Sequence, residues 1–85
     1  MSLNDSKRII LRKMLVSHRK ELNLTQAELA LKLSKPQSFV SKYESGERKI
    51  DAIELIELIQ YLGDSPSDFI RQYCLTLEKI DGFKI

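Results

Sequence analysis

The sequence predicts a single all-α domain of five helices over residues 1–85. Three observations favour this class. Glycine and proline, which interrupt helices, number only three and two, and good helix formers fill the segments between them. Apolar residues recur at helical spacing, and no segment alternates as a strand would. The composition, 42% apolar and 31% charged, is that of a globular chain large enough to bury one core.

The first helix is expected from about Ser6 to Leu22, with Asn4 or Asp5 as its N-cap. Asn23 can adopt the left-handed conformation that ends such a helix. The spacing 4-3-4 predicts an apolar face, widened by two further residues: Leu11, Leu15, His18 and Leu22, with Ile10 and Met14. The opposite side of the helix carries the cations Lys7, Arg8, Arg12, Lys13 and Lys20.

A capping box is expected to open the second helix. Thr25 and Glu28 have the spacing at which each side chain satisfies a backbone N–H of the first turn. The inner face of this helix should bury Leu29, Ala30 and Leu33. The next helix start lacks a side-chain oxygen at Pro36, so either that helix begins a residue early with Lys35 at the cap, or Ser34 supplies the oxygen.

The third helix is expected over about Gln37 to Ser45, with Gly46 as a left-handed C-cap. Helical spacing directs three residues inward, Val40 and Tyr43 with Phe39 beside them. The outward side is polar and free of acidic residues, and it consists of Gln37, Ser38, Ser41 and Lys42.

Two more helices complete the chain. A second capping box, Asp51 with Glu54, starts the fourth helix, whose solvated face should carry Glu54 and Glu57. The fifth helix is expected over residues 66–80. It carries an apolar stripe of Phe69, Tyr73, Leu77 and Ile80. This stripe either packs back on the core or contacts a second copy of the chain.

The charge is distributed unevenly, although the net charge is only +2. Residues 1–50 hold 11 Lys/Arg against 5 Asp/Glu, and residues 51–85 hold 3 against 7. This asymmetry favours contact between the first half and a polyanion. An accidental distribution over charged helical surfaces is the alternative.

Several classes of protein are disfavoured. The lone Cys74 permits no internal disulfide and fits a reducing cytoplasm. No apolar run approaches the roughly 20 residues that cross a bilayer, and no signal-peptide core follows the N-terminus. The chain offers no nucleophile–base–acid set, metal cluster or phosphate loop, so no enzymatic activity, cofactor, metal or small-molecule ligand is expected. His18 is expected to be a partly buried packing residue.

Four motifs stand in order along the chain: Leu15-x3-Arg19, Leu24-Thr25-Gln26-x-Glu28-Leu29-Ala30, Gln37-Ser38-x-Val40-Ser41-x-Tyr43-Glu44-x-Gly46-x-Arg48 and Leu58-x3-Leu62-Gly63. Together they resemble the Cro/phage-repressor type of helix-turn-helix domain, over roughly Leu11 to Phe69. The resemblance implies a repressor-like DNA-binding domain in which the second and third helices form the helix-turn-helix. Its core would span about residues 6–70, with the C-terminal helix of about 66–80 available for dimerisation.

The resemblance also implies roles for individual residues. The third helix would be the recognition helix, with bases read by Gln37, Ser38 and Lys42. A glutamine amide can donate to and accept from adenine, with discrimination of about 1–3 kcal/mol when both bonds form. Phosphates would be bound by Thr25, Gln26, Ser41, Ser45, Arg48 and Lys49. Gln26 would also brace the recognition glutamine, and Arg19 and Glu44 would form a structural ion pair.

These features predict a cytoplasmic transcriptional regulator that binds double-stranded DNA in a sequence-specific manner, as a homodimer on a palindromic operator. The expected dimer contact is either the stripe of Phe69, Tyr73, Leu77 and Ile80 or surplus apolar surface on the fourth helix. The alternative is an antitoxin or restriction–modification controller protein, which would bind a protein partner and regulate its own promoter. For Gln26, Gln37, Ser38, Arg48 and Lys49, the alternative is an ordinary exposed polar residue.

Overall fold

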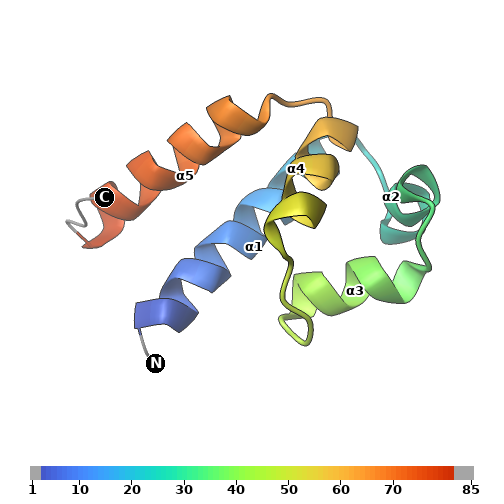
Figure 1. The fold of residues 1–85 in the computed structure, drawn as a ribbon, viewed down its shortest axis with the longest axis horizontal. Helices are drawn as coiled ribbons and strands as arrows, with labels where there is room; N and C mark the ends of the chain where they lie inside the picture. Colours follow the sequence, from blue (N-terminus) through green and yellow to red (C-terminus); the bar gives the residue numbers. More distant parts are fainter. Residues whose placement is uncertain (1–2, 82–85) are drawn as a thin grey trace.

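A computed structural model describes residues 3–81, and this range folds into five α-helices (Figure 1). They are α1 (Leu3–Glu21), α2 (Gln26–Leu33), α3 (Gln37–Ser45), α4 (Ala52–Tyr61) and α5 (Pro66–Asp81). No strand occurs within residues 3–81, and the predicted all-α class is confirmed. None of the described helices is long and apolar enough to cross a bilayer.

The short helices α2 and α3 pack against each other at one end of the molecule (Figure 1). The long helix α1 contacts both α3 and α5, and α4 contacts α2 and α5. The α2–α3 unit is therefore held from behind by the other helices, because each of its members packs against one of them. This arrangement leaves the outer side of α3 facing solvent.

Both predicted capping boxes are present. The Thr25 hydroxyl accepts a hydrogen bond from the backbone N–H of Glu28 at 3.0 Å, and the Glu28 carboxylate accepts from the Thr25 N–H at 2.9 Å. In α4 the corresponding distances are 2.8 Å from the Glu54 N–H to Asp51 and 3.1 Å from the Asp51 N–H to Glu54. Hydrogen bonds of this kind satisfy N–H groups that a helix start leaves without partners, so they fix where α2 and α4 begin.

Two helix starts differ from the expectation. Helix α1 begins at Leu3, not near Ser6, because no glycine or proline interrupts the helix in this segment. Helix α3 has Pro36 at its N-cap in an extended conformation, and no side chain caps it. Both expected ways of capping α3, an earlier start with Lys35 at the cap and a hydroxyl oxygen from Ser34, were wrong. Ser34 is committed to the end of α2, where it takes a left-handed φ of 56°.

All five helices contribute to one buried core, whose members are Leu15, Leu29, Ala30, Phe39, Val40, Tyr43, Leu58, Ile59, Leu62 and Phe69. His18 packs edge-on against the Phe69 ring at a centroid distance of 5.2 Å, as a packing histidine was expected to do. Leu22 does not join the apolar face predicted for it. It lies past the last residue of α1 and is 48% exposed.

The apolar stripe of α5 packs mainly on its own chain. Phe69 and Leu77 are only 1% and 2% exposed, and the Tyr73 hydroxyl donates a hydrogen bond to the backbone carbonyl of Lys7 at 2.9 Å. These three residues therefore pack back on their own chain, which was one of the two alternatives. Among the four stripe residues only Ile80 is an exposed hydrophobic residue, and the use of the stripe as a dimer contact stays a prediction.

Candidate nucleic-acid interface

The outer side of α3 is a polar surface with free hydrogen-bonding groups. Gln37, Ser38 and Lys42 are exposed, and their side chains form no hydrogen bond within the part of the chain that the structure describes. The hydroxyls of Ser41 and Ser45 donate to carbonyls of α3 itself, at 3.3 and 3.1 Å. The amide of Gln37 and the ammonium of Lys42 thus remain available to an external ligand such as a base edge.

The inner side of α3 is fixed by an ion pair. The Arg19 guanidinium donates to the Glu44 carboxylate twice, from Nε to Oε2 at 2.7 Å and from Nη2 to Oε1 at 3.0 Å. Its Nη1 donates to the Leu24 carbonyl at 2.7 Å. The two side chains are 9% and 8% exposed, and the hydrogen bond to Glu44 raises the pKa of Arg19. The pair that the resemblance implied therefore joins α1 to the last turn of α3.

Gln26 at the start of α2 is connected to the same carboxylate. Its Nε2 donates to Glu44 Oε1 at 2.9 Å, and no hydrogen bond joins it to Gln37 within residues 3–81. The expected brace of the recognition glutamine is therefore absent from this structure. One N–H of the Gln26 amide is engaged by Glu44, which leaves its second donor for a phosphate. Thr25 is exposed beside it, although its hydroxyl already accepts the capping bond.

Arg48 in the loop between α3 and α4 is not a free cation. Its guanidinium donates to both Glu54 oxygens, at 2.9 and 2.8 Å, and lies over the Phe39 ring at 4.8 Å from the centroid. The Arg48 hydrogen bond lowers the pKa of Glu54, and the same bond raises the pKa of Arg48. Glu54 was expected on a solvated face, and this is corrected, since its side chain is only 16% exposed. Lys49, by contrast, is exposed and forms no ion pair within the described residues.

For two residues, Phe39 and Glu54, the sequence analysis did not predict the contact with Arg48. The Phe39 ring meets Tyr43 edge-on at 5.6 Å and receives two cations, Arg48 and Lys35, over its face. Glu54 holds Arg48 while it also caps α4. The only signal in the sequence was the capping box, which fixes the Glu54 carboxylate at the end of the loop. The position of Arg48 over Phe39 depends on tertiary packing and leaves no local pattern.

Comparison with known proteins places this arrangement in a family. A helix-turn-helix family profile matches residues 16–70, from the second half of α1 to the start of α5. Among solved structures, the chain is similar to an XRE-family like protein from Pseudomonas syringae pv. tomato str. DC3000. The two share 32% sequence identity over 87% of this chain and 90% of that chain, with a TM-score of 0.83. Among curated protein sequences, none matches. The chain belongs to the XRE/Cro-type helix-turn-helix family of DNA-binding transcriptional regulators.

Proposed function

We propose that the protein binds a palindromic operator as a homodimer and reads its sequence through α3. The observation that carries this proposal is the contrast between the two sides of that helix. Its inner side is fixed by a buried core and by the Arg19–Glu44 pair. On its outer side, the side chains of Gln37, Ser38 and Lys42 have no hydrogen-bond partner within the described residues. A rigid helix with free donors and acceptors at its N-terminal end suits direct readout in the major groove.

Base recognition is assigned to three residues of this helix. Gln37 would donate to and accept from an adenine, because adenine is the base whose major-groove edge pairs bidentately with an amide. Lys42 would approach the acceptor pair of a guanine, and Ser38 would contact an adjacent base. Their exposure and the absence of an acidic side chain on the outward side of the helix support these roles.

Phosphate contacts are assigned to the two edges of this surface. At one edge Gln26 and Thr25 lie at the N-terminus of α2, where the helix dipole also attracts an anion. At the other edge Ser45, the last residue of α3, and Lys49 in the loop that follows are exposed, and Ser41 lies one turn before Ser45 on α3. Arg48 would reach a phosphate only by sharing its charge with Glu54, so we assign it mainly to holding the loop.

A two-fold pair would place its recognition helices about 34–36 Å apart, one turn of DNA, so that each reads one half-site. Because Phe69 and Leu77 are buried in their own chain, we place the contact on the other expected surface, the exposed apolar residues of α4. Ile53 and Ile56 lie one turn apart on α4 and are 70% and 46% exposed. Their burial against a second copy would remove this apolar surface from water.

The second candidate function, an antitoxin or controller protein with a protein partner, uses the same exposed side chains of α4 in the acidic half of the chain. Selection of duplexes from a random pool, with the sedimentation of the protein–DNA complex measured on the same sample, separates the two. We expect an enriched palindrome bound by two subunits. Enrichment of a single half-site bound by one subunit would contradict the homodimer.

A further inference from the structure

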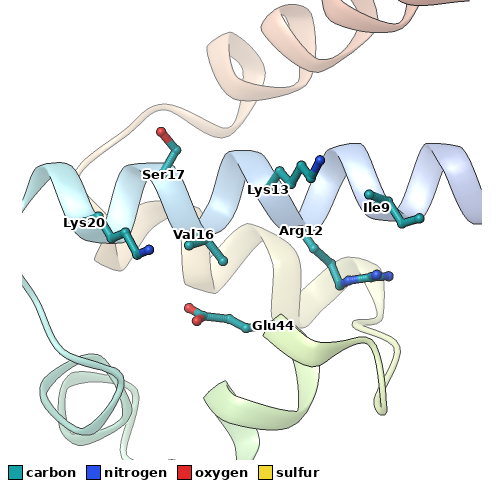
Figure 2. A pocket seen from close by; sticks show the side chains of 7 residues that line it. All are labelled: Ile9, Arg12, Lys13, Val16, Ser17, Lys20 and Glu44. Atoms are coloured by element: carbon teal, nitrogen blue, oxygen red, sulfur yellow. The ribbon is translucent and has the colours of Figure 1, made fainter.

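A basic groove lies along α1, outside the helix-turn-helix. It has a volume of about 410 Å³ and is formed by the flank of α1 that lies beside the end of α3 (Figure 2). Three cations line it, Arg12, Lys13 and Lys20, together with the apolar side chains of Ile9 and Val16. Arg12, Val16 and Lys20 follow one another at intervals of four residues, which places them along one side of the helix.

Within residues 6–80, no ion pair compensates the positive charge of this groove. Its single acidic lining residue, Glu44, is already bound by Arg19 at 2.7 Å and by Gln26 at 2.9 Å. The three groove cations form no ion pair with any side chain between residues 6 and 80. A hollow with three unpaired cations attracts an anionic ligand that carries several charges.

The groove is continuous with the candidate DNA interface at two points. Glu44 lines the groove and accepts the hydrogen bond of Gln26 at the N-terminus of α2. Arg12 lies against the end of α3: a Cβ atom built on Gly46 would be only 3.0 Å from the Arg12 guanidinium carbon. The guanidinium is therefore packed over the backbone that follows Ser45. The groove flanks α3 between two positions that we assign to phosphate contact.

We propose that this α1 groove binds the sugar–phosphate backbone of duplex DNA and extends the contact beyond the helix-turn-helix. The inference rests on the proposed DNA-binding function. Arg12, Lys13 and Lys20 contact phosphates, and Ile9 and Val16 pack against deoxyribose carbons. Arg12 and Lys20 are eight positions apart, or about 12 Å along the helix axis, which is long enough to reach more than one phosphate.

An acidic peptide with apolar side chains would use the same chemistry. The continuity with Gln26 and Ser45 favours DNA, because a ligand that occupies the proposed interface already passes the ends of the groove. A peptide partner has no such connection to α3, and we treat it as an outcome of the test.

The test measures how salt weakens binding to a 30-bp duplex of mixed sequence. The groove variant is the double substitution Lys13→Gln/Lys20→Gln. The matched control is Arg71→Gln/Lys79→Gln on α5, which removes two exposed cations from outside the groove. Each lost phosphate contact lowers the slope of log K against log salt by about 0.9. We expect a decrease of about 1–2 in the groove variant and little change in the control. Equal midpoints of thermal unfolding in the two variants verify that both are folded.

Two failures are distinguishable. If the wild-type chain binds no duplex at low salt, the proposed function is overturned and this inference with it. If the wild type binds but the slope of the groove variant equals that of the control, only the groove contact is overturned. A poly-glutamate peptide that binds the wild type and not the groove variant, with the DNA slope unchanged, would overturn the inference in favour of a peptide site.

Discussion

Arg19 and Glu44, 25 residues apart in sequence, form a shielded pair of hydrogen bonds that joins α1 to the recognition helix α3. The same carboxylate accepts from Gln26 at the start of α2. One acidic side chain thus connects three helices, and it is placed directly behind the surface that we assign to DNA. The orientation of α3 therefore depends on a contact to which we assign no DNA-reading role.

Replacement of Arg19 by Ala should destabilise the fold by about 3–5 kcal/mol, because it leaves the shielded Glu44 carboxylate without its cation. Urea unfolding measures the loss. The double variant Arg19→Met/Glu44→Leu is the control, since removal of both charges leaves nothing buried and unpaired, and it should recover much of the stability. A loss below about 1 kcal/mol in the single variant would indicate a pair that behaves as an exposed one.

Tyr43 is fully buried, and its hydroxyl has no hydrogen-bond partner among the described residues. Tyr43→Phe removes this group and should leave stability unchanged or raise it by about 1–2 kcal/mol, because a buried polar atom without a partner costs free energy. A clear loss of stability in the variant would reveal a partner for the hydroxyl.

The same residue predicts a pH effect. Burial raises the pKa of Tyr43, so the folded state keeps its proton while the unfolded state ionises near the ordinary value of about 10. The contribution of protonated Tyr43 to the free energy of unfolding is therefore complete below about pH 10, and it falls as the pH rises above that value. Unfolding of wild type and Tyr43→Phe, compared from pH 9 to 11, should show a steeper decline in the wild type. Parallel declines would assign the effect to other groups.

Lys49 and Arg48 should differ in their effect on DNA binding, although they are adjacent cations. Lys49→Ala should lower the salt slope by about one unit, since its charge is free. Arg48→Ala should lower it by less, because Glu54 already neutralises the guanidinium. Titrations of one duplex at four salt concentrations give both slopes. An equal decrease in both variants would mean that Arg48 leaves Glu54 for a phosphate.

Substitutions on α5 and α4 should separate folding from dimerisation. Leu77→Asp places a charge at a site that is 2% exposed, and it should unfold the chain. Ile53→Asp changes a side chain that is 70% exposed, so the fold should survive and the dimer dissociate. Circular dichroism and sedimentation measure the two effects. A folded Ile53→Asp variant that sediments like a dimeric wild type would locate the contact elsewhere.

The parts of the fold that could be predicted from the sequence are those governed by local hydrogen bonds. Thr25 and Glu28 are three residues apart, so their spacing alone fixes the start of α2. Tertiary contacts behave differently. The helical spacing of the apolar residues that include Phe69 and Leu77 indicated a buried face on α5. Spacing does not tell whether the chain itself or a second copy covers that face.

The candidate site was predictable to a similar extent. The outward position of Gln37 and Lys42 follows from helical spacing, whereas their roles came only from the family resemblance. The pair between Arg48 and Glu54 was missed because side-chain direction in a loop depends on what it packs against, here the Phe39 ring. The groove on α1 was missed for a related reason: cations on the wet side of a helix acquire significance only when another element, the end of α3, is placed beside them.

The most direct test of base reading by α3 is the effect of Gln37→Ala on two duplexes, the selected operator and a scrambled duplex of equal length, titrated at the same salt concentration. We expect the variant to lose about 1–3 kcal/mol of binding free energy on the operator while its affinity for the scrambled duplex stays unchanged. An equal loss on both duplexes, or no loss on either, would contradict the assignment of Gln37 as a base-reading residue.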